Sequence, residues 1–149
     1  MTQDGKRPMQ DIIDAAKDGQ VSLSFNESIR VNAEEFVYIE RDCEAMKNKI
    51  RDLQTLAKDI SGRQKWGLGE GVEWIKTGGT LVSWFRGKAE GDPSGNTVYA
   101  ILERHYQIVD SIQELHRAIA ERYQQTDSSF AAEYNQAQAS IPHGLQGKK

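Results

Sequence analysis

The feature that most constrains the fold is a heptad repeat in the first half of the chain. Between residues 29 and 60, apolar residues recur at alternating intervals of three and four positions, and most positions between them are charged. Such intervals keep side chains on one face of an α-helix, whereas a half-buried strand needs strict alternation. The repeat predicts a long amphipathic helix over residues 27–60, with Asn26 or Ser28 as its N-cap. This first seam consists of Ile29, Asn32, Phe36, Ile39, Cys43, Met46, Ile50, Leu53, Ala57 and Ile60.

A second seam with the same alternating intervals lies in the other half of the chain and predicts a second helix over residues 97–135. We expect Asn96 or Thr97 to cap its start. Asn32 and His105 are polar residues within the two seams, and we expect them to be buried and to fix the register. The second seam consists of Val98, Ile101, His105, Ile108, Ile112, Leu115 and Ile119.

Two seams of similar length bury their apolar stripes best when the helices fold back against each other. The fold class we predict is therefore all-α, with a long, coiled-coil-like antiparallel helical hairpin over residues 27–135. We expect residues 1–26 to be mostly flexible, with one helical turn near Asp11 to Lys17, and residues 136–149 to be a disordered tail.

The connector between the two helices, residues 61–96, is glycine-rich and aromatic. It holds nine of the thirteen glycines and all three tryptophans. It is longer than the usual link between bundle helices. We expect a small cap of two short helices separated by Gly78 and Gly79, or a loop that orders on a partner. Its apolar side chains should be buried on the hairpin or on a partner, namely Trp66, Val72, Trp74, Ile75, Leu81, Val82, Trp84 and Phe85.

Composition excludes several classes of function. The formal net charge of −3 argues against a protein that binds nucleic-acid phosphates. The chain has no apolar run long enough to span a bilayer, so we expect no stable membrane insertion. Residues 1–28 lack the apolar core of a cleavable signal peptide.

Catalytic and metal-binding residues are not evident in the sequence. Cys43 lies in a seam, where a free cysteine usually packs as a small hydrophobe. His105 and His116 are eleven residues apart, about 16 Å along a helix, and are too distant to share an ion. We therefore expect no enzymatic activity, no metal and no cofactor.

The two amphipathic helices, the Trp- and Gly-rich turn and a Tyr-x-x-x-Asp after the second seam resemble the Trp-x-Gly helical-hairpin family of type VII (ESX) secretion. The resemblance covers residues 27–135 and implies that Tyr123 and Asp127 form part of an export signal. No strict Trp-x-Gly occurs, because both candidate turns read Trp-x-x-Gly. The residues implied for the hairpin tip and partner surface are Trp66, Gly67, Gly69, Trp74, Trp84 and Gly87.

The resemblance implies a non-enzymatic secreted substrate, or a partner that pairs with a larger helical substrate or toxin. Its partners would be the secretion machinery and another helical protein or a second copy, giving a homo- or heterodimer. It would leave the cell by a signal-peptide-independent route, after a cytoplasmic pool. Two alternatives remain: a cytoplasmic coiled-coil adaptor or chaperone unrelated to secretion, and a membrane-surface protein that uses the tryptophan loop.

Overall fold

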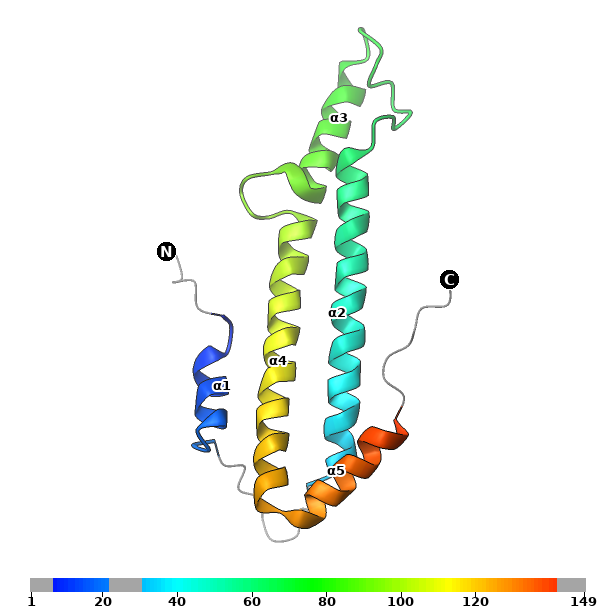
Figure 1. Cartoon of the computed structure of the whole chain (residues 1–149). Helices are drawn as coiled ribbons and strands as arrows, with labels where there is room; N and C mark the ends of the chain where they lie inside the picture. Colours follow the sequence, from blue (N-terminus) through cyan, green and yellow to red (C-terminus); the bar gives the residue numbers. More distant parts are fainter. Residues whose placement is uncertain (1–6, 22–30, 142–149) are drawn as a thin grey trace. The chain divides into compact units, whose positions relative to one another are not determined.

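The computed structural model describes residues 7–21 and 31–141. Within these residues all regular structure is helical and no strand occurs, which confirms the all-α prediction. Figure 1 shows the elements in chain order. They are α1 (Gln10–Lys17), α2 (Ala33–Gly62), α3 (Lys76–Arg86), the short π-helix η1 (Gly87–Gly91), α4 (Val98–Thr126) and α5 (Ser128–Ser140).

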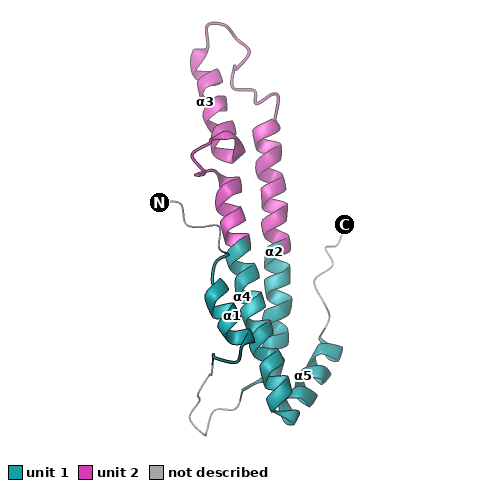
Figure 2. Ribbon diagram, turned by 60° about the vertical axis from the view of Figure 1, so that its left-hand side comes forward, with its two compact units in different colours: residues 1–47, 107–149 teal, residues 48–106 magenta. Residues whose placement is uncertain are grey.

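The chain divides into two compact units, coloured separately in Figure 2. Unit 1 comprises residues 1–47 and 107–149, and unit 2 comprises residues 48–106. Both long helices, α2 and α4, contribute a part to each unit.

The start of α2 differs from the predicted one. The side-chain Oδ1 of Asn32 accepts a hydrogen bond from the backbone N–H of Glu34 at 3.0 Å, so Asn32 caps the helix. Asn32 is exposed, and its predicted role as a buried seam residue is wrong. The predicted caps Asn26 and Ser28 lie outside the described residues.

The second predicted helix is two helices. Thr97 Oγ1 accepts a hydrogen bond from the backbone N–H of Ala100 at 3.0 Å and caps α4, in agreement with the prediction for its start. The chain then leaves the helical conformation at Asp127 (φ −134°, ψ 107°) and enters α5. Since α5 reaches Ser140, residues 136–140 are helical and not part of a disordered tail, and residues 142–149 lie outside the described part.

Helix α1 falls in the segment predicted to be mostly flexible and includes the expected turn. Its Ile13 and Ala16 are buried in unit 1. Residues 1–6 and 22–26 of that segment are not among those described.

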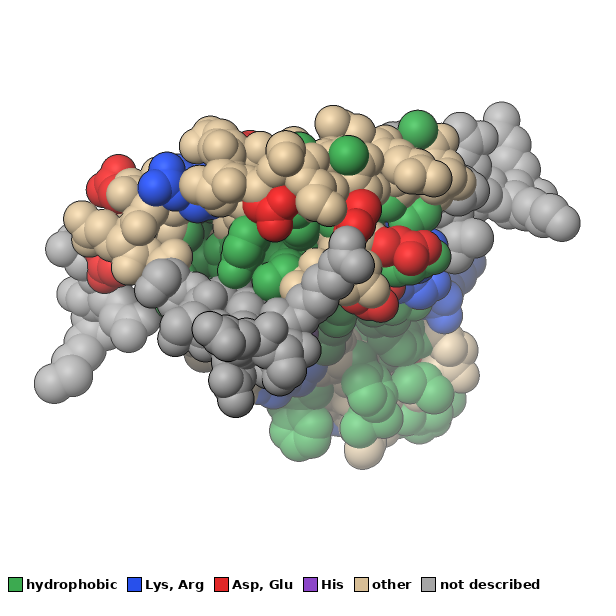
Figure 3. Space-filling model, turned by 90° about the horizontal axis from the view of Figure 1, so that it is seen from below, with side chains coloured by type: hydrophobic (Ala, Val, Ile, Leu, Met, Phe, Trp, Pro, Cys, Tyr) green, Lys and Arg blue, Asp and Glu red, His purple; other side chains and the backbone are tan. Residues whose placement is uncertain are grey.

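In unit 1 the first part of α2 runs antiparallel to the second part of α4. Phe36 lies 6.5 Å from Tyr123 between ring centroids, whereas Lys47, further along α2, pairs with the earlier residue Asp110 of α4. Helix α5 adds a small apolar cluster, formed by Val37, Ala137 and Ile141 with Tyr38 and Tyr134. Seen from the end that carries α5, hydrophobic side chains gather behind polar atoms and acidic groups (Figure 3).

In unit 2 the remaining parts of α2 and α4 are also antiparallel. Arg51 pairs with Glu103, while the later residue Gln54 donates a hydrogen bond to the earlier Tyr99 carbonyl at 3.4 Å. The buried apolar side chains of this unit are Ile50, Ala57, Val82 and Ala89.

Candidate interaction surfaces

One edge of the α2–α4 contact in unit 2 is closed by charged and aromatic groups. The Arg51 guanidinium lies 2.6 Å from the Glu103 carboxylate and 3.8 Å from the centre of the Tyr106 ring. The Lys58 ammonium lies 4.9 Å from the centre of the Tyr99 ring. The long side chains on this edge therefore pair with charged and aromatic groups of the opposite helix.

The other edge is apolar and open to solvent. Leu53 and Leu56 on α2 are 40% and 53% exposed, and Val98 and Ile101 on α4 are 50% and 36% exposed. We call these four side chains the open edge. In the described part of unit 2 no element covers them to the degree expected for a core.

Helix geometry places the open edge opposite the charged one. Each residue turns a helix by about 100°. On α2 the buried contact line runs through Ile50, Gln54 and Ala57. Leu53 comes one position before Gln54, whereas Arg51 comes one position after Ile50. The two side chains are therefore rotated away from the contact line in opposite directions about the axis of α2.

On α4 the residues nearest α2 include the half-buried Tyr99, whose carbonyl accepts the hydrogen bond from Gln54, and the half-buried Leu102. Val98 and Ile101 each stand one position before one of these two residues. A residue one position before a contact residue is rotated about 100° away from the facing helix. When two helices are antiparallel, this rotation brings such residues of both helices to the same side of the pair. The open edge is therefore a single stripe shared by both helices.

The predicted seams are only partly buried. Ile50 is buried, Phe36 and Ile39 are half-buried, and Met46 and Leu53 are exposed. On α4, Ile101 and Ile108 are exposed, and the polar seam residue His105 is also exposed, so its predicted buried role is wrong. Val98 of this seam is exposed as well, and the other predicted α4 seam residues are half-buried, namely Ile112, Leu115 and Ile119.

Sequence reasoning missed Gln54, which is 3% exposed and is central to the contact in unit 2. Its amide donates a hydrogen bond to the Glu103 carboxylate at 2.9 Å. Gln54 stands four residues after Ile50 and three before Ala57, so its spacing was a signal, but its polarity kept it out of the seam.

A second surface is the tip segment, which we define as the loop after α2 together with α3, residues 63–86. Its loop folds around the carboxylate of Glu70. That carboxylate accepts hydrogen bonds from the backbone N–H groups of Trp66, Gly67 (3.2 Å) and Leu68 (2.9 Å). These bonds, the one from Trp66 first, lower the pKa of Glu70 to about 2.

Three glycines allow this loop to close on α3. Gly67 and Gly69 have φ of 76° and 79°, a conformation that favours glycine. Gly78 lies within α3, and a Cβ there would stand 2.1 Å from the Leu68 carbonyl oxygen. The prediction that Gly78 and Gly79 separate two short helices is wrong, because Gly78 instead lets the loop approach a continuous helix.

The three tryptophans of the tip segment differ in environment. Trp66 stacks on Phe85, with ring centres 5.7 Å apart and planes 10° apart. Trp74 and Trp84 are 84% and 67% exposed, so of the two predicted alternatives burial on the hairpin is wrong and burial on a partner stays a prediction. Gly87 follows α3, and a Cβ at this position would meet no neighbouring atom within 4 Å.

The predicted export-signal residues both have structural partners in unit 1. The Tyr123 ring lies 5.3 Å from that of Phe130, which is buried and also packs edge-on against Phe36 at 5.7 Å. The exposed Asp127 carboxylate accepts hydrogen bonds from the backbone N–H groups of Ser129 (2.9 Å) and Phe130 (3.1 Å). Asp127 is therefore the N-cap of α5.

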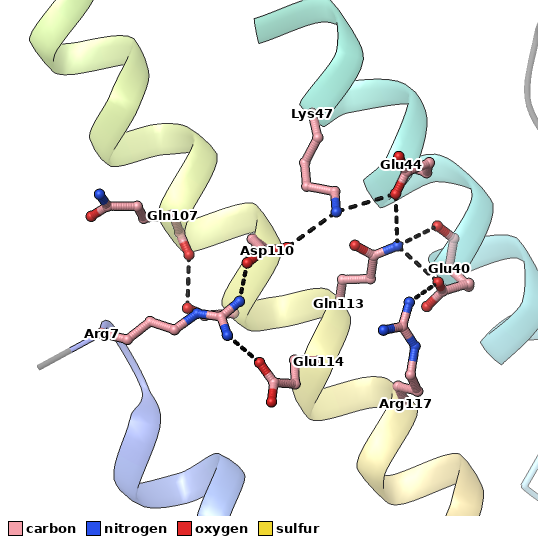
Figure 4. A network of polar contacts seen from close by, with 10 residues as sticks. Arg7, Glu40, Glu44, Lys47, Gln107, Asp110, Gln113, Glu114 and Arg117 are labelled. Carbon is pink, nitrogen blue, oxygen red and sulfur yellow. Dashed lines mark hydrogen bonds and ion pairs between the residues drawn. The ribbon is translucent and has the colours of Figure 1, made fainter. Parts of the chain in front are cut away.

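A polar network joins Arg7, which lies just before α1, to side chains of α2 and α4 in unit 1 (Figure 4). The Lys47 ammonium lies 3.1 Å from both the Asp110 and Glu44 carboxylates. Burial lowers the pKa of Lys47, but the hydrogen bonds to Asp110 and Glu44 outweigh it and raise the pKa. The hydrogen bond from Lys47 lowers the pKa of Glu44, with a further contribution from Gln113.

The same network fixes α1 on α4. Arg7 pairs with Asp110 and Glu114, and Lys17 lies 2.6 Å from Glu114. The hydrogen bond from Lys17 lowers the pKa of the Glu114 carboxyl, and the charge of Arg7 adds to this effect. The opposite charges of these groups neutralise one another, as expected for ion pairs that stabilise the packing of helices.

Cys43 lies half-buried on α2, and burial raises the pKa of its thiol. A nucleophilic cysteine needs the opposite shift. Among the described residues no group of three or more His, Cys, Asp and Glu side chains is arranged to hold a metal ion.

None of the helices in residues 7–21 and 31–141 combines the length and apolar character that crossing a membrane requires. Comparison with known proteins found no matching family model, no similar curated protein and no similar solved structure. The resemblance to the Trp-x-Gly family therefore stays a prediction.

Proposed function

We propose that the chain is a non-enzymatic helical protein that binds a helix of another protein, or of a second copy of itself, through the open edge of unit 2. The observation that carries this proposal is the asymmetry of the α2–α4 contact. One edge is closed by Arg51 and Glu103, whereas the other exposes Leu53, Leu56, Val98 and Ile101.

Burial of apolar surface supplies the driving force for such an interaction. It contributes about 25 cal/mol per Å² of apolar surface removed from water. All four side chains of the open edge are branched aliphatic groups whose exposed surface a bound helix would bury. Neighbouring leucine, valine and isoleucine side chains on paired helices are the usual anchors for a third helix.

The proposal includes a single helical hairpin formed by the whole of α2 and α4. Each helix has about thirty residues, so the hairpin would be about 45 Å long. Spin labels at the exposed positions 35 and 59 of α2 should then lie about 36 Å apart, at 1.5 Å per residue of an unbroken helix. A clearly shorter distance would contradict the hairpin.

We further propose that the protein is exported by a type VII system, with Tyr123 and Asp127 as part of its signal. The support is the position of this Tyr-x-x-x-Asp at the end of α4, where Asp127 is exposed. Both residues also stabilise the fold, so alanine substitutions would confuse loss of signal with loss of structure.

Export is tested with conservative variants in the organism that encodes the chain. Tyr123→Phe keeps the ring against Phe130, and Asp127→Asn keeps an N-cap while removing the charge. We expect both variants to remain folded and to be depleted from the culture filtrate.

The matched control is a second pair with the same spacing on α2, in which the tyrosine is half-buried, as Tyr123 is, and the aspartate is exposed. Tyr38→Phe and Asp42→Asn should leave export unchanged. Retention of the wild type in the cell, or normal export of both signal variants, would contradict type VII export. The adaptor or chaperone alternative would then remain.

A further inference from the structure

The tip segment carries the most exposed large hydrophobic side chains of the described residues. Trp74 and Trp84 exceed every other side chain of this kind in exposed fraction. Exposure of two indole rings is costly in water and calls for a surface that covers them.

The exposure of these rings is not the result of a loose loop. Glu70 holds three successive backbone N–H groups, and Gly78 brings α3 against the Leu68 carbonyl. The Trp66 ring is stacked on Phe85 within the same segment. The segment thus has internal order that holds Trp74 and Trp84 outward.

Helix α3 has a buried side and an outer row. Gly78 and Val82 are buried, four residues apart. Thr77, Leu81 and Trp84 follow intervals of four and three on another face, and all three are exposed. The helix therefore presents the apolar side chains of Leu81 and Trp84 to the outside, while its side with Gly78 and Val82 is buried in unit 2.

The charge of the tip segment differs in sign from that of the chain. Residues 63–86 contain four basic residues and two acidic ones, a formal charge of +2, so the rest of the chain carries −5 of the total of −3. One of the two acidic groups, Glu70, is turned onto the backbone. The basic residues are Arg63, Lys65, Lys76 and Arg86.

We propose that the tip segment binds the surface of anionic phospholipid bilayers. Trp74, Trp84 and Leu81 enter the headgroup region, and Lys65 and Lys76 lie near the lipid phosphates. Indole rings favour this boundary because one part of the ring is apolar and the N–H finds polar partners. The binding is peripheral and requires no spanning helix.

The charge pattern favours lipid over a protein occupant. An anionic surface attracts the tip segment and repels the more acidic remainder, which orients the chain with its tip toward the bilayer. A second copy would bring two positive tip segments together. The open edge, by contrast, is aliphatic and is the surface proposed above for a helix.

The test is vesicle flotation of the full chain at low salt. We expect binding to vesicles of equal phosphatidylcholine and phosphatidylserine, a blue shift of tryptophan emission, and weak binding to phosphatidylcholine alone. Added salt should release the protein. The double variant Trp74→Ala/Trp84→Ala should bind on the order of tenfold less. Since both rings are exposed, the fold should persist, as circular dichroism can verify.

A second variant tests the charge separately. Lys65→Gln/Lys76→Gln should reduce binding to anionic vesicles and leave the residual binding to phosphatidylcholine unchanged. Met46→Ala and Leu53→Gln, at exposed apolar positions outside the segment, should bind vesicles like the wild type. Leu53→Gln also separates this inference from the proposed function, because it damages only the open edge.

The inference is overturned if the wild type floats with neither kind of vesicle, or if it binds phosphatidylcholine vesicles as well as those that contain phosphatidylserine. It is also overturned if the tryptophan variant binds like the wild type. If the wild type binds no vesicles and instead forms a complex with another protein chain that the tryptophan variant cannot form, the tip segment would be a protein contact and not a lipid contact.

Discussion

Two adjacent glycines of α3 provide a matched test at the scale of single residues. A Cβ at Gly78 would meet the Leu68 carbonyl oxygen at 2.1 Å, whereas one at Gly79 would meet only the Glu70 carbonyl oxygen at 3.9 Å. Alanine is the better helix former at both positions, by up to about 1 kcal/mol.

We therefore expect opposite signs for the two substitutions. Gly79→Ala should be neutral or should stabilise the protein slightly, and Gly78→Ala should destabilise it by about 1–3 kcal/mol, because the loop must move away from α3. Urea unfolding measures both, and hydrogen exchange at residues 66–68 should increase only in Gly78→Ala. Equal effects of the two variants would contradict the close approach.

Single polar residues were the hardest to interpret from sequence. Asn32, Thr97 and Asp127 all cap helices, yet only Thr97 was expected to do so. A cap requires the local backbone to leave the helix, and heptad spacing carries no information on that. Asn32 was assigned to the first seam because its position matches the heptad interval. Asp127 was assigned to the export signal because it completes the Tyr-x-x-x-Asp.

At the scale of elements, ion pairs to α4 add to the burial of Ile13 and Ala16 in holding α1 in unit 1. The contact between Lys17 and Glu114 depends on an ionised carboxylate, and the pKa of Glu114 is lowered by Lys17 and Arg7. A lowered pKa means that the stabilisation is present above the ordinary value of 4.5 and is lost as the pH falls through the lower folded-state value.

The comparison of the wild type with Glu114→Gln tests this contact. At neutral pH the variant should melt at a lower temperature than the wild type. The loss in free energy of unfolding should be less than about 1 kcal/mol, as expected for a partly exposed ion pair. The difference should shrink as the pH falls below 4.5 and vanish in acid. A difference that persists in acid would mean that the side chain acts by packing and not by charge.

The long helices were predictable because their repeats extend over many turns. The break between α4 and α5 was not, since no glycine or proline marks it and Asp127 stops α4 only through its cap. The continuity of α3 was missed for the opposite reason. Two glycines usually weaken a helix, and only the approach of Leu68 explains Gly78.

At the scale of the whole molecule, the sequence predicted that the two seams would pack against each other but did not predict which apolar side chains would stay exposed. The seams suggested that Leu53 and Ile101 face the opposite helix, yet both are exposed. The contact in unit 2 is displaced toward Gln54, and charged pairs such as Arg51 with Glu103 occupy one edge. Only the pairing of the two helices reveals which edge is open.

The central claim is that the open edge of unit 2 contacts another helix. Site-specific photo-crosslinking in the native cell tests it most directly, with the photoreactive residue at position 53 or 98 and a matched control at the exposed position 55, on the far side of α2 from position 53. We predict cross-links from 53 and 98 to a helical segment, of this chain or another, and none from 55. No cross-link from 53 and 98, or the same product from all three positions, would contradict the claim.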